Sequence, residues 1–382
     1  MHPTERSSMD DVIVIGAGPI GAAAAHHASR RGMQVRIIGP NEAPRATHQV
    51  WSSHYDQGRL AHRSARNVEL ARWAWESMER YRDIEQRSGI DFFHPCGTLS
   101  LSATLEHFSY TRIRPDLEAA LGFRYTDYAI GSMTTQFPML AADLPYAGVY
   151  DGPPSGIINP RRMVAAHLVL AVQHGTQLER DIVTTVVPTA TEVTVRTAAG
   201  QTYRAHRAII AAGAYSGLSG LLPSPIAHTI KSETVTLAEV SAAQAQALRD
   251  MPSMMIDCQS DIISDAYLTP PVKYPDGKWY LKLGSNSVYD AFFETPVALR
   301  QWVSTGDASA THAAQIGLIQ SLFRGIDWLS FQSVPCVITR TPSGVPQITK
   351  VHAQVATMVG CNGSLAKSSD AIGRVLVETL LA

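Results

Sequence analysis

Several features are scarce in this chain of 382 residues, and each scarcity excludes a class of protein. Its four cysteines are scattered and include no Cys-x-x-Cys pair, which excludes a disulfide framework and argues against a structural zinc site. The formal net charge is only −1, so neither nucleic acid nor an anionic membrane is expected as the main partner. No apolar run approaches a membrane span, and residues 1–10 lack the hydrophobic region of a secretory signal. We therefore expect a cytoplasmic protein with a short disordered start and no metal centre.

What the chain does contain is an ordinary globular balance. Its 45% hydrophobic and 17% charged residues are typical of soluble folded proteins. Its length exceeds that of one small core, so we expect two or three domains, or one large α/β domain with an insertion. A specific function must therefore be sought in local motifs.

The first folded segment predicts a strand, a glycine-rich turn, a helix and a second strand in close succession. Residues 12–15 are Val-Ile-Val-Ile, a continuous apolar run typical of a buried strand in a parallel sheet. Residues 16–21 read Gly-Ala-Gly-Pro-Ile-Gly, and an alanine-rich helix follows them until Gly32. Residues 34–38 predict the next strand, which completes a βαβ unit of about thirty residues.

The spacing of Gly16, Gly18 and Gly21 matches the Gly-x-Gly-x-x-Gly fingerprint of dinucleotide-binding folds. The first glycine permits a tight turn, the second lets the backbone approach a pyrophosphate, and the third lets helix and strand pack closely. The helix that starts at Pro19 and Ile20 points free N–H groups and a partial positive charge at the phosphates. The alternative is a turn that only packs a strand on a helix, but the order strand, turn, helix and strand favours a dinucleotide site.

One residue of this fingerprint is missing. A carboxylate at the end of the second strand normally binds the adenosine ribose, but Gly39 occupies that place. Either Asn41 or Glu42 substitutes for it, or backbone groups and water hold the ribose. The missing carboxylate bears on how the ribose is bound more than on whether a dinucleotide binds.

Further elements alternate along the rest of the chain. An amphipathic pattern predicts a long helix over 62–87, and a second helix is predicted between Asn159 and Gly175. Short apolar runs over 254–293 predict antiparallel strands, and 371–381 predicts a final helix with one apolar face.

Nucleotide-binding signals lie near both ends and in the middle of the chain, which predicts a discontinuous cofactor domain. We assign residues 10–80, 155–225 and 330–382 to this domain. Residues 81–154 and 226–329 are assigned to a substrate domain inserted in two pieces.

Four further stretches occur in the order found in one family of flavoenzymes. They are 53–60 (Ser-His-Tyr-Asp-Gln-Gly-Arg-Leu), 209–216 (Ile-Ile-Ala-Ala-Gly-Ala-Tyr-Ser), 279–284 (Trp-Tyr-Leu-Lys-Leu-Gly) and 360–369 (Gly-Cys-Asn-Gly-Ser-Leu-Ala-Lys-Ser-Ser). With the fingerprint, they make nearly the whole chain resemble the monomeric sarcosine oxidase and N-methyltryptophan oxidase family, within the D-amino-acid-oxidase-like flavoenzymes. The resemblance implies FAD as cofactor.

The resemblance also implies roles for three cations. Arg59 matches an arginine beside the flavin, Lys282 a lysine that lies over the flavin and activates oxygen, and Lys367 a lysine that binds the substrate carboxylate. Arginine suits bidentate carboxylate recognition and lysine acts as a point charge, so Arg59 and Lys367 are the predicted pair for a carboxylated substrate. By itself Lys282 would be read as a solvent-facing strand lysine, and the family likeness favours the catalytic role.

A covalent bond to the flavin is implied at Cys336. In the resembled family, a cysteine in the corresponding strand is bonded through sulfur to the flavin 8α-carbon. The alternative is a buried free cysteine, which is common in protein cores, but the match of position favours the covalent link. Val183 precedes Thr-Thr-Val, a common flavoprotein pattern, and is the predicted backbone contact to adenine.

Departures from the family pattern concern the substrate side. Ile338 stands where the family has an aromatic residue, whereas Asn286 and Ser364 each stand where it has a histidine. The residues expected to face the flavin resemble the family more than those expected to face the substrate. We therefore predict a substrate other than sarcosine, larger or less compact.

These observations predict an α/β protein with a Rossmann-like FAD-binding domain and an inserted antiparallel-sheet substrate domain. The predicted activity is oxidation of a small-molecule amine or amino acid, secondary and carboxylate-bearing, to an imine by hydride transfer to flavin N5. Molecular oxygen is the expected acceptor and becomes hydrogen peroxide. The alternatives are a flavin dehydrogenase with another acceptor, a nicotinamide-dependent dehydrogenase, and a flavin-binding scaffold. The predicted catalytic residues are Lys282, Arg59 and Lys367. The predicted cofactor-binding residues are Gly16, Gly18, Pro19, Ile20, Gly21, Ser53, Gly58, Arg59, Val183, Ala212, Gly213, Cys336, Gly363, Ser364, Leu365 and Lys367.

Overall fold

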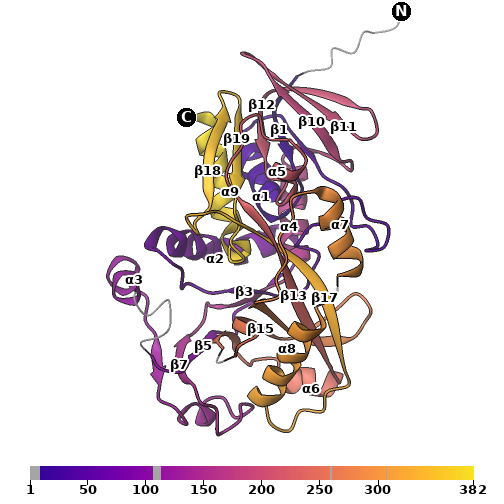
Figure 1. Cartoon of the computed structure of the whole chain (residues 1–382). Coiled ribbons are helices and arrows are strands. Elements are labelled where there is room, and N and C mark those ends of the chain that lie inside the picture. The colour runs from indigo at the N-terminus through magenta and orange to yellow at the C-terminus, as the bar shows by residue number, and fades with distance from the viewer. Residues whose placement is uncertain (1–8, 106–112, 259, 307) are drawn as a thin grey trace, which may run out of the picture.

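The computed structural model describes residues 9–105, 113–258, 260–306 and 308–382, so the predicted disordered start lies almost entirely outside the described residues. In this described part, two large sheets and one small sheet form, with one large sheet above the other in Figure 1. The upper sheet mixes parallel and antiparallel pairs, whereas the pairs of the lower sheet are antiparallel with one exception. The predicted mixed α/β fold class is confirmed.

The upper sheet is built around β1, which pairs in parallel with β2 and β12. Both faces of β1 are covered: Val12 and Val14 belong to the core beneath the helices, whereas Ile13 and Ile15 pack with the antiparallel strands β10 and β11. Burial on both faces explains the continuous apolar run in the sequence. The strands of this sheet are β1 (Asp10–Ile15), β2 (Val35–Ile38), β9 (Gln177–Glu179), β10 (Val183–Pro188), β11 (Val193–Thr197), β12 (Thr202–Ile210), β18 (Gln347–His352) and β19 (Val355–Val359).

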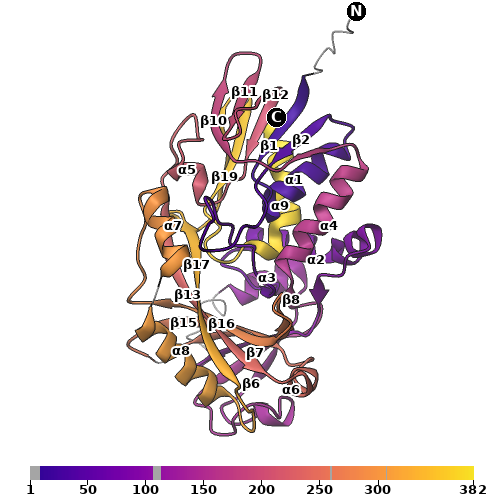
Figure 2. The same cartoon turned by 90° about the vertical axis from the view of Figure 1, so that its right-hand side faces the viewer.

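Helices cover one side of the upper sheet (Figure 2). Helix α1 packs on both α4 and α9, so segments from the start, middle and end of the chain share one core. Gly373 makes the close approach of α9 to α1 possible, because a Cβ there would lie 2.7 Å from the Cβ of Ala23. The helices of this layer are α1 (Pro19–Ser29), α2 (Val68–Ser88), α4 (Pro160–Gln173) and α9 (Ser369–Leu381).

The lower sheet is organised around the long strand β13, which runs antiparallel to β16 on one side and to β17 on the other. Helices α6 (Ala242–Ala247) and α8 (Ser309–Leu322) pack on this sheet, and α7 (Pro296–Thr305) packs near β17. Its strands are β5 (Thr98–Ser102), β6 (Thr126–Tyr128), β7 (Ala147–Asp151), β13 (Thr229–Val240), β14 (Ser253–Asp257), β15 (Ile263–Lys273), β16 (Trp279–Ser287) and β17 (Ser330–Arg340).

A small sheet of β3 (Arg59–Ala61), β8 (Gly156–Ile158) and β4 (Phe93–His94) brings the motif around Arg59 to the junction between the large sheets. Strand β17 lies in the predicted cofactor domain by its residue numbers but pairs with β13 of the lower sheet. The predicted division into domains stays a prediction. The remaining short elements are α3 (Arg114–Leu121), α5 (Tyr215–Leu218), η1 (Met133–Thr135) and η2 (Ala366–Ser368).

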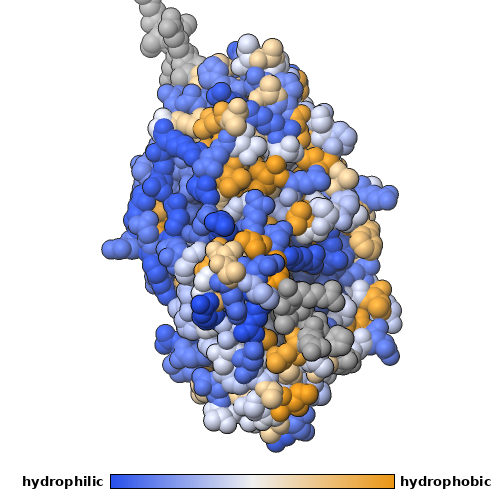
Figure 3. Space-filling model, turned by 90° about the vertical axis from the view of Figure 1, so that its left-hand side faces the viewer, coloured by the Kyte–Doolittle hydropathy of each residue, from blue (hydrophilic) through white to orange (hydrophobic). Residues whose placement is uncertain are grey.

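The long helix predicted from residue 62 begins at Val68. Asn67 caps it, because its side chain accepts a hydrogen bond from the Leu70 amide at 2.8 Å. None of the helices among the described residues is long and apolar enough to cross a membrane. On the face shown in Figure 3, apolar side chains lie in several separate groups surrounded by polar ones.

Candidate active site

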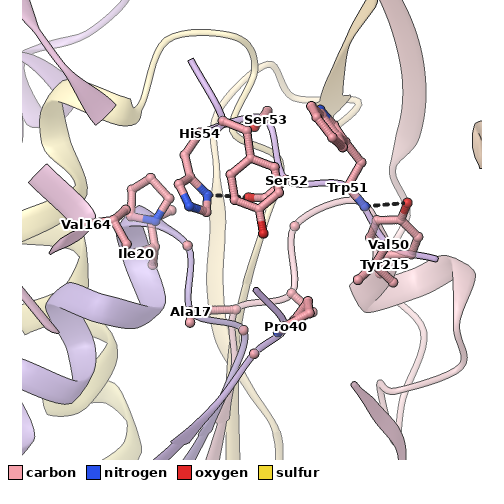
Figure 4. Close-up of a pocket in the computed structure, with 18 of the residues that line it drawn as sticks. Ala17, Ile20, Pro40, Val50, Trp51, Ser52, Ser53, His54, Val164 and Tyr215 are labelled. Atoms are coloured by element: carbon pink, nitrogen blue, oxygen red, sulfur yellow. Dashed lines mark hydrogen bonds between the residues drawn. The ribbon is translucent and has the colours of Figure 1, made fainter. Parts of the chain in front are cut away.

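A cavity of about 790 Å³ lies where the two large sheets meet. This volume is within the range of about 300–1,000 Å³ that is usual for ligand pockets. The turn between β1 and α1 forms one end, and β17 with part of β13 forms another part of the lining. Figure 4 shows the segment from Val50 to His54 crossing above the turn at Ala17, with Ile20 and Val164 to one side and Tyr215 to the other.

The three fingerprint glycines meet different constraints. Gly16 has a φ of 102°, and a Cβ there would lie 2.4 Å from the Ala211 carbonyl oxygen. A Cβ on Gly21 would lie 1.8 Å from the Gly16 carbonyl oxygen. At Gly18 the nearest side-chain atoms would be 3.7 Å away, so no protein atom requires a glycine there. The space beside Gly18 belongs to the cavity, as expected where a ligand approaches the backbone closely.

The amino end of α1 offers a site for an anion. Gly18 is the N-cap, no side chain caps the helix, and no acidic residue lies in its first turn. The free amides and the helix dipole therefore present partial positive charge to the cavity. Arg161 and Arg180 line the same cavity and add positive charge.

Geometry explains the missing ribose carboxylate. A Cβ on Gly39 would lie 2.6 Å from the Ala17 amide nitrogen, so any side chain there would collide with the fingerprint turn. Asn41 and Glu42 both line the cavity nearby. Glu42 is paired with Arg161 at 2.5 Å, so it is held at the cavity rim. Both residues therefore stay candidates for the ribose contact.

The segment above the turn carries a half-buried histidine. His54 is hydrogen-bonded to the Ser52 hydroxyl, and the Trp51 amide donates to the Tyr215 hydroxyl at 3.1 Å (Figure 4). Burial, and then the positive charges of Arg161 and Arg180, lower the pKa of His54 to about 3. The imidazole is therefore neutral at physiological pH and can accept or donate one hydrogen bond to a ligand.

Arg59 and Cys336 meet at the cavity. The Arg59 guanidinium lies 3.4 Å from the Cys336 sulfur and donates to the Ser53 carbonyl at 2.9 Å and to the Tyr267 hydroxyl at 2.8 Å. Burial raises the pKa of the Cys336 thiol, and the positive charge of Arg59 opposes that rise. The thiol is thus protonated at rest, with a cation in place to stabilise a thiolate.

Lys282 is fully buried and paired with Asp56. Its ammonium lies 2.7 Å from the Asp56 carboxylate and also donates to the Gly58 carbonyl. Burial lowers the pKa of Lys282, although Asp56 opposes that shift. Burial alone would raise the pKa of Asp56, but Lys282 and Arg59 hold it well below its usual value. The pair is therefore ionised, with Arg59 completing a group of two cations and one anion.

Lys367 lies apart from the large cavity. Its ammonium is 2.7 Å from a ring nitrogen of His62 and 3.1 Å from the Ser64 carbonyl oxygen, and it lines a separate, much smaller cavity together with Ser364. Burial lowers the pKa of Lys367 well below its usual value. Its Nζ therefore does not present a free donor to the large cavity.

Comparison with known proteins gives this geometry a family. A family model described as FAD dependent oxidoreductase matches residues 11–379. The chain belongs to the FAD-dependent oxidoreductases. This membership confirms the predicted enzyme class and the predicted FAD cofactor.

Relatives of this flavoenzyme bear out the resemblance seen in its sequence. It is 24% identical to a monomeric sarcosine oxidase of Bacillus sp. (strain NS-129), over 96% of this chain and 92% of that protein. It is 29% identical to a monomeric sarcosine oxidase of Streptomyces avermitilis, over 54% of this chain and 52% of that protein. A third relative, N-methyl-L-tryptophan oxidase of Salmonella arizonae, is 25% identical over 54% of each chain. In the last two matches, the chain spans about half the length of the relative.

Solved structures share the fold of this flavoenzyme. NikD, described as an unusual amino acid oxidase essential for nikkomycin biosynthesis, superposes with a TM-score of 0.76 at 20% identity, over 98% of this chain and 94% of that one. Amadoriase I from Aspergillus fumigatus, a fructosyl amine:oxygen oxidoreductase, superposes with a TM-score of 0.71 at 18% identity, over 100% of this chain and 88% of that one. Identities this low establish a common fold.

The cavity of the flavoenzyme fits FAD. The unobstructed backbone at Gly18 and the uncapped start of α1 suit a pyrophosphate. Leu178 and Val183 supply apolar surface where an adenine can lie. Arg59 of the small sheet and Cys336 of the lower sheet line the cavity together. These residues would hold the cofactor, which supplies the redox chemistry.

The flavoenzyme brings most of the predicted site residues to one cavity, and their roles stay predictions. Gly21, Gly58, Lys282, Ser364 and Lys367 do not line that cavity. Of these, Gly21 packs α1 on the preceding turn, and Gly58 and Lys282 belong to the buried group with Asp56. The predicted residues that do line it are Gly16, Gly18, Pro19, Ile20, Ser53, Arg59, Val183, Ala212, Gly213, Cys336, Gly363 and Leu365.

Sequence reasoning missed several groups of this site. Asp56 stood inside a motif without an assigned role, yet it holds Lys282, Arg59 and the Tyr274 hydroxyl, the last at 2.8 Å. Tyr267 orients Arg59, and the glycine of the Leu-Lys-Leu-Gly motif leaves room for its ring. That glycine could have signalled a bulky neighbour. Glu233 lines the cavity as the ladder neighbour of Cys336, and nothing in the sequence pointed to it.

Proposed function

We propose that this protein oxidises an amine to the corresponding imine and passes the electrons to oxygen, producing hydrogen peroxide. The observation that supports it most is Lys282, buried beside the FAD cavity and fixed by Asp56 and the Gly58 carbonyl. FAD, when bound, accepts a hydride equivalent from the carbon next to the amine nitrogen. The names of two relatives, monomeric sarcosine oxidase and N-methyl-L-tryptophan oxidase, agree with an amine substrate.

The chain's own residues supply charge and orientation. A fixed cation stabilises negative charge as it develops on the cofactor or on oxygen, and it does so more strongly in a site that excludes water. Lys282 and Arg59 are the cations so placed, and Asp56 and Tyr267 prevent both from turning into solvent. This fixed positive charge supports an oxidase role for Lys282.

Cys336 is the proposed attachment point for the flavin. Its thiol lines the cavity, and the neighbouring Arg59 can stabilise its thiolate form. Trp302 fixes the backbone at this position, because its indole donates to the Cys336 carbonyl at 2.9 Å. A covalent link would tether one edge of the cofactor to β17 of the lower sheet.

A second candidate is a flavin dehydrogenase that uses an acceptor other than oxygen. One observation favours it: Lys282 is fully buried, is neutralised by Asp56 and does not line the cavity. The rate at which oxygen reoxidises the reduced enzyme separates the two candidates.

The visible spectrum of the purified protein tests the cofactor first. We expect a two-band flavin spectrum, and after acid precipitation the colour should stay with the pellet. Colour released into the supernatant would remove the link at Cys336 and keep the flavoenzyme. A panel of secondary amines, assayed for flavin bleaching without oxygen and for peroxide in air, then tests the reaction. Bleaching without peroxide would favour the dehydrogenase, and no bleaching with any amine would refute the proposed activity.

A further inference from the structure

Glu233 occupies a position in the cavity that no motif explains. It lies in the middle of β13, and its Cα partner across the antiparallel ladder is Cys336 of β17. Directly paired residues point to the same face of a sheet, and both residues line the cavity. Only 5% of Glu233 is exposed. A carboxylate therefore stands beside the thiol proposed to hold the flavin.

The Glu233 carboxylate has no hydrogen-bond or ion-pair partner in the described part of the chain. Burial raises its pKa, opposed at longer range by Arg59, Lys231 and Lys282. No Glu233 oxygen is among the fully buried side-chain atoms that lack a partner, so the carboxylate faces the open cavity. A ligand that closed this cavity without offering it a partner would leave a costly buried charge. Such a group is usually completed by a ligand or belongs to a functional site.

The cations near Glu233 are all committed to other groups. Both terminal nitrogens of Arg59 already have partners in Asp56, Tyr267, Ser53 and Cys336.

Two buried lysines are likewise committed. Lys282 is held by Asp56, and Lys231 on the same strand as Glu233 is paired with Asp290. The donor predicted for a substrate carboxylate, Lys367, faces a different cavity. Within the described residues, the three cations that act on Glu233 therefore have partners, whereas its carboxylate has none.

We propose that Glu233 binds a positively charged group of the substrate, which makes the substrate a cationic amine rather than an amino acid anchored by its carboxylate. This proposal rests on the proposed amine oxidation, because it assigns the same cavity. An ammonium within hydrogen-bonding distance would satisfy the carboxylate without displacing Arg59 or Lys282 from their partners. Such a substrate carries two amines, one that is oxidised and one that Glu233 binds. Ile338, which also lines the cavity, adds apolar surface for the carbon chain between them.

A matched pair of compounds tests the charge that the site selects. One is an N-methylated diamine and the other is the N-methylated amino acid of the same chain length, so that an ammonium replaces a carboxylate at the far end. The measurement is the apparent second-order rate constant for flavin reduction without oxygen. We expect the diamine to react at least about tenfold faster. The exchange Glu233→Gln should lower the rate constant for the diamine by about ten- to a hundredfold, the range for one hydrogen bond to a charged group.

The control variant is Glu239→Gln, which makes the same exchange on the same strand. Glu239 is paired with Lys278 near the surface and is remote from the cavity lining. The exchange Glu239→Gln should leave the rate constants for the diamine and for the amino acid unchanged. An amino acid that reacts faster than the diamine, or a diamine rate that Glu233→Gln leaves intact, would overturn the proposal.

A binding measurement separates this inference from the proposed activity. A tert-alkyl ammonium compound keeps its N–H donors but has no hydrogen on the carbon next to nitrogen. It therefore cannot be oxidised in the same way, and its binding is read from the perturbed flavin spectrum. Binding that is lost in Glu233→Gln but retained in Glu239→Gln supports the cationic site even if no amine bleaches the flavin. Equal binding by all three proteins would refute it even if amines are oxidised.

Discussion

Individual side chains decide how the enzyme treats oxygen. We expect Lys282→Met to slow reoxidation of the reduced flavin by oxygen about a hundredfold, the usual cost of removing one fixed electrostatic group. FAD binding should persist, because Lys282 does not line the cavity and Asp56 keeps Arg59 and Tyr274 as partners. Stopped-flow mixing of the reduced protein with oxygen measures the rate.

The control for this exchange is Lys278→Met. Lys278 precedes the same strand but is about half exposed, so its loss should leave reoxidation unchanged. Equal oxygen rates in Lys282→Met and the unmodified protein would remove Lys282 from the oxygen reaction and favour the dehydrogenase.

The sequence identified residues whose identity is imposed by local geometry or by a contiguous motif. Gly16 and Gly21 were predictable because a tight turn and a close helix contact both require glycine. Asp56, Tyr267 and Glu233 were not. Asp56 and Tyr267 bind side chains that lie more than 200 positions away in the sequence, and Glu233 reaches the cavity only because β13 pairs with β17. Even the missing carboxylate at Gly39 has a reason that only the contact with Ala17 reveals.

Among the secondary-structure elements, the contact between helices α1 and α9 constrains the sequence closely. A Cβ on Gly373 would lie 2.7 Å from both the Ala23 Cβ and the Ala24 amide nitrogen. We expect Gly373→Ala to destabilise the protein by about 1–3 kcal/mol, the usual cost of overpacking. Urea unfolding followed by circular dichroism measures the change.

Helix α8 offers the opposite case. Gly317 is also inside a helix, but its Cβ position has no atom within 4 Å. Gly317→Ala should therefore stabilise the protein by about 0.5–1 kcal/mol through helix propensity. If Gly373→Ala were stabilising too, the close contact between the helices would be wrong.

Most individual elements could be predicted from periodicity and capping, but their partners could not. The run at 254–293 predicted antiparallel strands, and β14, β15 and β16 are found there. The pairing of β14 with β5 joins residues about 150 positions apart, and no local pattern encodes it. The long helix starts six residues later than predicted, because Asn67 caps it and residues 62–67 form a loop between β3 and the helix.

For the molecule as a whole, the cavity couples the two large sheets. Residues from the fingerprint turn of the upper sheet and from β13 and β17 of the lower sheet line one space. A ligand that binds the folded protein there and does not bind the unfolded chain stabilises the entire fold. Near saturation, the free energy of this stabilisation grows with the logarithm of the ligand concentration. Free energies of unfolding should therefore be compared between proteins whose cavities are all saturated with FAD.

The helical layer contains a buried polar cluster that should make the whole fold sensitive to acid. His26 of α1 and His167 of α4 lie 3.2 Å apart, near Asp370 of α9, which pairs with His27 at 2.9 Å. Burial, more than neighbouring charge, lowers the pKa of His26 to about 2 and that of His167 to about 4. Both imidazoles are therefore neutral in the folded protein well below the ordinary histidine pKa.

The direction of the pH effect follows from these lowered values. Below about pH 6.5 the unfolded chain takes up protons that folded His26 and His167 do not, so stability falls as the pH drops toward about 4. The contribution of His167 is on the order of 3 kcal/mol at most, from about 1.4 kcal/mol per pKa unit. In FAD-saturated protein, the free energy of unfolding should decrease from pH 7 to pH 5.

The exchange His167→Leu tests the source of this acid sensitivity. It removes one titrating group and fills the site with an apolar side chain, so the decrease between pH 7 and pH 5 should become shallower. Burial raises the pKa of Asp370, but His27, His167 and Arg80 together hold it below its usual value. Because His27 and Arg80 remain in the variant, Asp370 should still not titrate in this window. The matched control is His206→Leu at the upper-sheet surface, where the imidazole is exposed. Equal pH slopes in all three proteins would show that the buried histidines titrate normally in the folded state.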